Sequence, residues 1–197
     1  MAHTGPISAE DLRRVSSGRW FVSILAEMSL SGGSRFGTLH RALGLSRSVL
    51  SNHLDLLERF GWIARNPGHG HPLRPEYLLT TKGRIIAAWS ARVVEQRDRI
   101  GLGPKDLGRW SLPLLFELRG DRRRFSELER SLLPITPRAL TLAIGQMLDV
   151  RLVDRAADPV PLYGLTPRGT DFAASLQPAR QACSTSSVHQ NLLWGES

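Results

Sequence analysis

The same pattern of residues occurs twice in this chain. Each copy contains a Trp, then an Arg-Phe pair, a Leu-rich segment and a closing Tyr-x-Leu-Thr-x-x-Gly motif. Trp20 in the first copy matches Trp110 in the second, 90 positions later, and Gly83 matches Gly169, 86 positions later. Because the spacing changes only at loops, it indicates two copies of one domain rather than a solenoid of short repeats.

Helical periodicity, capping residues and turn signals predict the same order of elements in both copies. In the first copy, Ser8 and Asp11 form a capping-box pattern, and Thr80 or Thr81 is expected to cap a long helix. The helices predicted for this copy cover residues 8–15, 20–28, 36–43, 46–60 and 81–100. Short strands are predicted at 62–65 and 77–79, and loops at 29–34 and between the strands. This is the order of a winged helix.

The expected fold is therefore mainly α with small β wings, arranged as two tandem winged helix-turn-helix domains. We place domain 1, with an N-terminal helix and a long linking helix, at residues 1–100. Domain 2 follows at 101–180, beginning with the linker Gly-Leu-Gly-Pro-Lys-Asp-Leu-Gly. The tail at 181–197 is rich in Ser and Gln and is expected to be mobile.

Two predicted helices have an apolar face that is expected to be buried. In helix 20–28 the residues of this face are Trp20, Ile24, Leu25 and Met28. In helix 81–100 they are Ile85, Ala88, Trp89 and Val93. The second face can pack the two copies of one chain together, or it can join two chains, so the sequence leaves a homodimer open.

The charge of the chain favours a polyanionic partner, most simply nucleic acid. The formal net charge is +8 and the sequence pI is near 11.0. Residues 1–100 contain 14 Arg and Lys against 8 Asp and Glu, an excess of 6, whereas residues 101–197 contain 12 against 10, an excess of 2. The first copy therefore holds most of the positive charge.

Other features of the composition predict a cytoplasmic protein without membrane contact. Cys183 is the single cysteine, so no internal disulfide can form, which fits a reducing compartment. No stretch approaches the roughly 20 apolar residues of a membrane span. The N-terminal residues do not have the basic and then apolar pattern of a secretory signal.

The helix predicted at 46–60 contains the strongest candidates for reading DNA. A winged helix inserts its third helix into the major groove, where side chains of its N-terminal half reach base edges. Arg pairs bidentately with guanine, Asn with adenine, and Ser contacts bases or phosphates. The candidate residues are Arg47, Ser48, Ser51, Asn52 and Arg59. A merely solvated polar face is the alternative, but the preceding turn, the basic hairpin and the net charge favour DNA.

The loop of the first hairpin adds further basic residues. Cations in such a wing contact phosphate or enter the minor groove. The candidates are Arg65, His69, His71 and Arg74. His69 and His71 are also of metal-ligand type, but no Cys or carboxylate cluster accompanies them, so neither a metal nor a cofactor is predicted.

The second copy is weaker at the same positions. Arg138 and Thr141 retain a cation and a hydroxyl on its reading helix, whereas Leu142 stands where the first copy has Asn52. Its wing also contains two Asp residues, which repel phosphate. A basic run before its second short helix can contact the DNA backbone, or it can simply be solvated. This run is Arg122, Arg123 and Arg124. Whether this copy reads bases stays open.

The sequence does not predict an enzyme. It contains no G-x-S-x-G elbow, no H-E-x-x-H zinc motif and no P-loop. Cys183 has no evident activating partner, so we expect an incidental thiol rather than a redox switch.

Taken together, these motifs resemble the HxlR family of bacterial transcription regulators, which is related to the MarR group. The resemblance rests on the Trp of the first core helix, Arg-Phe-x-x-Leu before the turn, the Leu repeat of the reading helix and the closing strand motif. It covers residues 18–100 and again 108–176. It implies DNA-binding transcription control, usually by homodimers on inverted repeats. By the family motif, the reading positions are Arg47, Ser48, Ser51 and Asn52, with the wing at 65–74.

The sequence therefore predicts a sequence-specific DNA-binding transcription regulator in which domain 1 reads the major groove. A protein-interaction adaptor without specific DNA binding is the main alternative. A dimerisation module of the kind found in small-molecule methyltransferases is a third, but no residues remain for its catalytic domain. The expected partner is double-stranded DNA, and the sequence leaves open a small-molecule effector as well as the homodimer.

Overall fold

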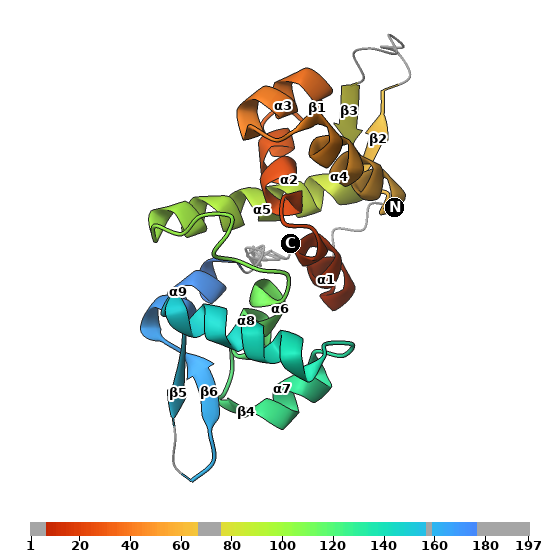
Figure 1. The fold of residues 1–197 in the computed structure, drawn as a ribbon. Helices are drawn as coiled ribbons and strands as arrows, with labels where there is room; N and C mark the ends of the chain where they lie inside the picture. Colours follow the sequence, from red (N-terminus) through yellow and green to blue (C-terminus); the bar gives the residue numbers. More distant parts are fainter. Residues whose placement is uncertain (1–6, 67–75, 157–158, 177–197) are drawn as a thin grey trace, which may run out of the picture.

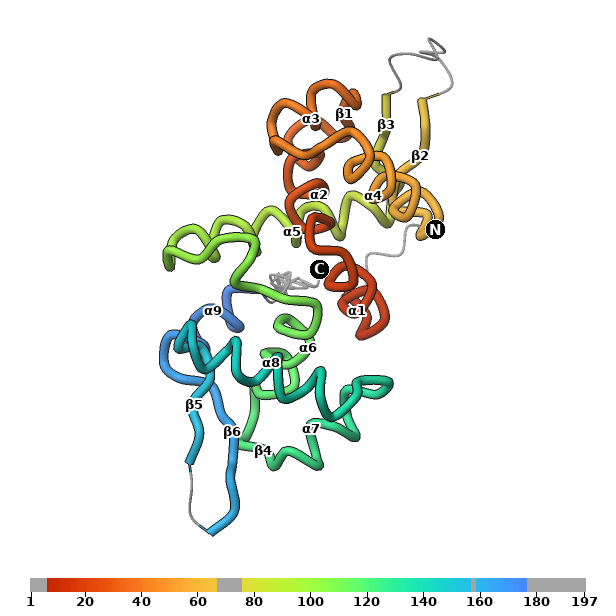
Figure 2. Tube along the Cα trace, viewed as in Figure 1, coloured from red at the N-terminus to blue at the C-terminus, as the bar shows by residue number. Residues whose placement is uncertain are grey.

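The computed structural model describes residues 7–66, 76–156 and 159–176 (Figure 1). Within these ranges the chain forms two winged-helix halves, and the expected mainly α fold with two tandem winged helix-turn-helix domains is confirmed. The hairpins of the two halves point in opposite directions, and helix α5 (Thr81–Arg99) runs between the halves (Figures 1 and 2). The predicted tail at 181–197 lies outside the described residues.

The first half begins with helices α1 (Ala9–Ser17) and α2 (Phe21–Ser29). A helix-turn-helix, a small sheet and α5 follow. The bounds of these elements are β1 Gly33–Arg35, α3 Phe36–Leu43, α4 Arg47–Arg59, β2 Ile63–Arg65 and β3 Glu76–Leu79. The predicted helices 8–15, 36–43, 46–60 and 81–100 correspond to α1, α3, α4 and α5, with their ends shifted by two residues or fewer.

The second half repeats this plan after the linker. Its core helix α6 (Ser111–Glu117) corresponds to α2, and its last helix α9 (Pro167–Ser175) corresponds to α5. The elements between them are β4 Arg123–Arg124, α7 Phe125–Ser131, α8 Pro137–Asp149, β5 Val153–Ala156 and β6 Leu162–Leu165. In this half α8 is the counterpart of the reading helix α4.

Each half contains a three-stranded antiparallel sheet, of which the sequence predicts only two strands. In the first sheet β3 lies between β1 and β2, and in the second β6 lies between β4 and β5. The segment 29–34, predicted to be a loop, contributes the start of β1, and the Arg122–Arg124 run contributes β4. These strands have two or three residues, too few to show a periodicity, and they form only because a distant strand pairs with them.

Trp20 and Trp110 lie just before α2 and α6, as their N-cap residues. The prediction that Trp20 belongs to a buried helical face is therefore only partly right, because Trp20 packs against the core from just before the helix. Trp20 is only half-buried, and the next residue, Phe21, is 1% exposed in its place. The rest of the predicted face of α2 is buried, namely Ile24, Leu25 and Met28.

Helix α5 buries part of the face that was expected. Trp89 and Val93 are buried as predicted, but Ile85 is half-buried and Ala88 is exposed. Their places in the core are taken by Ile86 and Ala87. The reason is that α5 contacts both α2 of its own half and α9 of the other half, so its buried face is wider than a single stripe.

The two halves share one continuous hydrophobic core. Trp89 donates its indole N–H to the carbonyl oxygen of Leu176 at 2.8 Å, and its ring centre lies 6.4 Å from that of Phe116. At the end of α5, Arg168 donates to the carbonyl oxygen of Ile100. Because Trp89 is 1% exposed within a single chain, it offers no surface through which a second chain could dock.

The matched Thr and Gly of the repeat join each sheet to the helix that follows it. Thr80 and Thr166 cap α5 and α9, and each hydroxyl accepts a hydrogen bond from the N–H of the matched glycine at 3.0 Å. A Cβ on Gly83 would lie 1.7 Å from the Trp62 carbonyl oxygen, and one on Gly169 would lie 1.9 Å from the carbonyl oxygen of the matched residue, Leu152. These positions therefore exclude any side chain.

Replacing Gly83 by Ala is expected to lower the free energy of unfolding by about 1–3 kcal/mol, because the backbones of two segments must separate to admit a methyl group. Gly145→Ala in α8 is the matched control, since nothing lies within 4 Å of its added Cβ. That change is expected to be neutral or to stabilise by up to about 1 kcal/mol through helix propensity. Urea denaturation measures both, and equal effects would contradict the close-approach argument.

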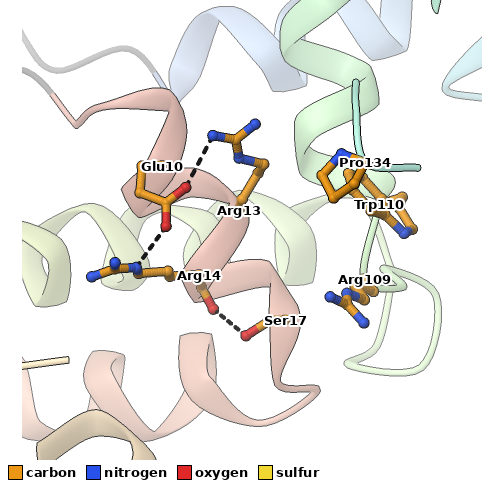
Figure 3. A pocket seen from close by; sticks show the side chains of 7 residues that line it. All are labelled: Glu10, Arg13, Arg14, Ser17, Arg109, Trp110 and Pro134. Atoms are coloured by element: carbon orange, nitrogen blue, oxygen red, sulfur yellow. Dashed lines mark hydrogen bonds and ion pairs between the residues drawn. The ribbon is translucent and has the colours of Figure 1, made fainter. Parts of the chain in front are cut away.

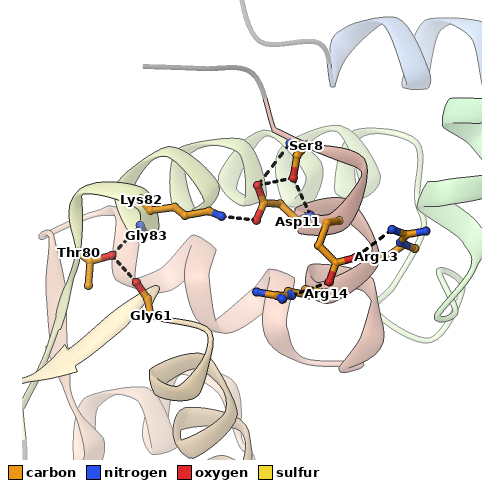
Figure 4. A network of polar contacts seen from close by, with 9 residues as sticks. Ser8, Asp11, Arg13, Arg14, Gly61, Thr80, Lys82 and Gly83 are labelled. Carbon is orange, nitrogen blue, oxygen red and sulfur yellow. Dashed lines mark hydrogen bonds and ion pairs between the residues drawn. The ribbon is translucent and has the colours of Figure 1, made fainter. Parts of the chain in front are cut away.

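Helix α1 is fixed to the first half by a shielded ion pair (Figure 4). The Asp11 side chain is 9% exposed and lies 2.7 Å from the Lys82 ammonium. It also accepts from the Ser8 hydroxyl at 2.7 Å, and that hydroxyl accepts from the Asp11 backbone N–H, which confirms the predicted capping box. Burial alone would raise the pKa of Asp11, but the hydrogen bonds from Lys82 and Ser8 outweigh it and hold the pKa below its usual value.

Lys82→Met is expected to lower the free energy of unfolding at pH 7 by about 1–2 kcal/mol, because Asp11 keeps a shielded charge without its cation. A carboxyl whose pKa is depressed by folding stabilises the protein above its ordinary pKa of 3.8, and this contribution is lost as the pH falls through the folded value. The difference between wild type and variant should therefore shrink between pH 7 and pH 3 in urea denaturation. Lys105→Met, in the exposed linker, should show no such difference at either pH.

Candidate nucleic-acid interface

Helix α4 is positioned by a tight turn on one side and a buried stripe on the other. Gly44 ends α3 in the left-handed conformation, at φ 62°, which glycine adopts without strain. The Ser46 hydroxyl then accepts from the Val49 N–H at 3.4 Å and caps α4. The stripe that anchors the helix is fully buried, as predicted, and consists of Leu50, Leu54 and Leu57. The opposite face of α4 is thereby turned outward.

The outward face of α4 brings together the residues predicted to read DNA. Four of them are exposed, namely Arg47, Ser48, Asn52 and Arg59, while Ser51 is half-buried. Within the described ranges, Arg47, Asn52 and Arg59 have neither a hydrogen-bonding partner nor an ion-pair partner for their side chains. Their guanidinium and amide groups are therefore free to bind a molecule outside the chain.

Arg65, in β2, lies against α4. Its guanidinium is 3.5 Å from Asp55 and 3.4 Å from Glu58, and it also lies 5.9 Å from the centre of the Tyr77 ring. The two carboxylates offset its charge, so Arg65 links the hairpin to α4 and is less available to phosphate than the sequence suggests. The spacing of Asp55 and Glu58, three residues apart on one helical face, was the signal for this pairing.

The other predicted wing residues, His69, His71 and Arg74, lie outside the described residues, and their contact with DNA stays a prediction. In the part of the chain that the structure describes, no group of three or more His, Cys, Asp or Glu side chains is arranged to hold a metal ion.

Helix α8 presents a different outward face. Thr136 caps it, and Pro137 occupies its first turn. Arg138 and Thr141 are exposed, as is Leu142, whose side chain is 66% exposed. The Thr141 hydroxyl donates to the Pro137 carbonyl oxygen at 2.9 Å, so the helix itself already uses it. This face therefore offers a cation and an apolar side chain, without the free amide found on α4.

The predicted basic run of the second half does not form a single patch. Arg122 lies 2.6 Å from Asp154 of β5, and this hydrogen bond raises the pKa of Arg122. Arg123 is half-buried, opposite Tyr163 of β6, while Arg124 is exposed. Successive side chains of a strand point to opposite faces, which separates Arg123 from Arg124 within β4.

The structure adds one basic residue that the sequence analysis missed. Arg41 lies in the last turn of α3, is exposed, and has no ion-pair or hydrogen-bond partner among the described residues. The first helix of a helix-turn-helix crosses the DNA backbone, so a cation at its end is well placed for phosphate. Its position three residues before the glycine of the turn was the available signal.

The capped turn, the buried stripe and the open face of α4 define a winged helix-turn-helix protein. The chain belongs to the HxlR-like helix-turn-helix family, whose model matches residues 15–98 and again residues 107–187. The two matches fall on the two winged-helix halves, so the resemblance found in the sequence is confirmed. Its relatives are named HTH-type transcriptional regulators, which implies regulation through DNA binding.

Curated relatives match a part of the chain. An uncharacterized HTH-type transcriptional regulator of Mycobacterium tuberculosis is 43% identical over 70 residues, which cover 36% of this chain and 44% of that protein. The uncharacterized HTH-type transcriptional regulator YvaP of Bacillus subtilis is 39% identical over 74 residues, covering 37% of this chain and 68% of YvaP. The chain thus spans less than half the length of the first of these relatives. No solved structure matches the chain. No described helix is both long and apolar enough to cross a membrane.

Proposed function

We propose that this protein is a sequence-specific DNA-binding transcription regulator whose helix α4 reads bases in the major groove. The observation that carries the proposal is the outward face of α4, where Arg47 and Asn52 are exposed and have no partners among the described residues. Both lie in the N-terminal half of the helix, from which recognition helices reach base edges. Arg is suited to the O6 and N7 atoms of guanine, and Asn to N6 and N7 of adenine.

The second half contributes backbone contacts in this proposal rather than base reading. Leu142 occupies the position that corresponds to Asn52 of α4, and the Thr141 hydroxyl is hydrogen-bonded to the backbone of its own helix. Arg122 is paired with Asp154, which lowers its attraction for phosphate. Arg138 and Arg124 remain exposed, and such cations bind phosphates without regard to sequence.

The shared core supports a single chain acting on an asymmetric DNA site. Helices α4 and α8 share one hydrophobic core, and their outward faces differ, with free polar groups on α4 and Leu142 on α8. A protein with two identical halves requires a palindrome, because its operator mirrors its symmetry. Here one half of the site would be read by sequence, and the other half would be held through its backbone.

Asn52→Ala, and separately Arg47→Ala, should each weaken binding to the target site by about 1–3 kcal/mol, because each removes a bidentate contact with one base. The target is first selected from genomic fragments, and affinity is measured by fluorescence anisotropy at fixed salt. Leu142→Ala at the matched position of α8 is the control, with an expected change below about 0.5 kcal/mol. If both α4 variants bind the target as the wild type does, α4 is not the reading helix.

Binding should also depend steeply on salt, because Arg and Lys displace counterions from the phosphates. With several cation–phosphate contacts, the slope of log K against log salt is expected to be on the order of −4 or steeper. Anisotropy titrations from low to physiological salt give this slope. A slope near zero would instead support the adaptor, whose winged helices bind proteins.

A further inference from the structure

We infer that a pocket between the two halves binds a planar organic anion, a molecule with one or two aromatic rings and a carboxylate. The pocket has a volume of about 300 Å³ and lies between α1 and the second half (Figure 3). Glu10, Arg13 and Arg14 of α1 line one side, and Arg109, Trp110 and Pro134 line the other. Its volume is at the lower end for small-molecule sites, which suits a compact ligand.

The charged groups of the pocket leave a positive excess. Three guanidinium groups face a single carboxylate, that of Glu10. Arg14 lies 2.8 Å from one oxygen of Glu10 and Arg13 lies 3.0 Å from the other, and hydrogen bonds from Arg14 and then Arg13 lower the pKa of Glu10. Glu10 is therefore held on the α1 side by Arg14 even if an incoming anion engages Arg13.

Arg109 is the cation that remains available. It is exposed, and within the described ranges it forms neither a hydrogen bond nor an ion pair. Its guanidinium carbon lies 5.7 Å from the centre of the Trp110 ring, so a cation and a flat aromatic surface adjoin. An aromatic ring can stack on the indole of Trp110 while its carboxylate takes a bidentate contact from a guanidinium.

The pocket is not a by-product of the internal repeat. The first half has the same Arg-Trp pair, Arg19 and Trp20, at the matched position. Helix α1 precedes only the first copy, and Trp20 lines a different groove that includes Glu27 and Glu95. The pocket at Trp110 is lined by three arginines and one carboxylate, whereas the groove at Trp20 is lined by two carboxylates and one arginine, so only the second position has a positive excess.

A ligand in this pocket would act on the turn that leads into α8. Arg13 donates to the carbonyl oxygen of Leu133 at 3.1 Å, and Leu133 lies between α7 and α8 next to Pro134. An anion that draws the Arg13 guanidinium toward Trp110 competes with this hydrogen bond. By changing the turn before α8, the ligand would change the affinity for DNA. This effect rests on the proposed function, whereas binding of the ligand to the pocket does not.

The test uses the full chain without DNA and three probes in isothermal titration calorimetry. The probes are 1-naphthoate, 1-naphthylmethanol, which has the rings without the charge, and inorganic phosphate, which has the charge without the rings. We expect 1-naphthoate to bind with a Kd on the order of 0.1–1 mM. It should bind at least about tenfold more tightly than either of the other probes, because only it can use both Arg109 and Trp110.

Arg109→Gln should reduce the affinity for 1-naphthoate at least about tenfold, because a charge-assisted contact is lost. Arg130→Gln, at an exposed α7 residue outside the pocket, is the matched control and should leave the affinity unchanged. Arg109 is exposed and forms no hydrogen bond or ion pair within the described chain, so both variants should unfold close to the wild-type urea concentration. Trp110→Leu supplies a second test by removing the stacking surface while keeping the cation.

Three outcomes overturn the inference. One is equal affinity for the three probes, and another is wild-type affinity for 1-naphthoate in Arg109→Gln. The third is no binding of 1-naphthoate while Arg109→Gln weakens binding to duplex DNA, which would make these arginines backbone contacts. Because the calorimetry contains no DNA, its failure leaves the proposed function intact, and a failure of DNA binding leaves the pocket testable.

Discussion

The burial of Trp89 joins two winged helices that would otherwise be separate bodies on a linker. Its indole N–H is out of reach of water, and a buried donor without a partner is costly. The partner is the carbonyl oxygen of Leu176, in the other half, so the hydrogen bond can be satisfied only when α9 lies against α5. Phe116 packs beside the same indole. Packing of α1 against α6 and the hydrogen bond from Arg168 to Ile100 hold the same two halves together, so the relative orientation of α4 and α8 depends on this contact together with those.

The parts of the fold that the sequence predicts correctly are those determined by neighbours along the chain. The capping box at Ser8, the glycine turn at Gly44 and the leucine stripe of α4 each depend on residues within one or two helical turns. Strand β1 and strand β4 form by pairing with strands 38 to 45 positions away, and no local sequence pattern predicts them. The burial of Ala87 instead of Ala88 likewise depends on which helices pack against α5, namely α2 and α9, and these are distant in the sequence.

The predictions for the candidate site likewise succeed where they depend on neighbours along the chain and fail where they depend on residues brought together by folding. Exposure of Arg47 and Asn52 follows from the amphipathic pattern of α4, so the sequence suffices to find them. Whether a cation is free to bind DNA is a separate question, because it depends on which carboxylates lie near it in the folded chain. Arg65 and Arg122 are also predicted as DNA contacts, Arg65 as a cation of the wing and Arg122 as part of a basic run, but both lie beside carboxylates. Sequence patterns thus locate cations well, and only the packed structure distinguishes a free cation from one that is already neutralised.

The shared core also changes how the protein responds to its own abundance. Two subunits held together without a covalent link separate once their concentration falls below the dissociation constant of the pair. Two halves of one chain stay together at any dilution, because the linker between α5 and α6 keeps them in reach of each other. A cell with very few copies would still contain only assembled pairs. Occupancy of any partner that requires both halves would then rise with the first power of chain concentration rather than with its square.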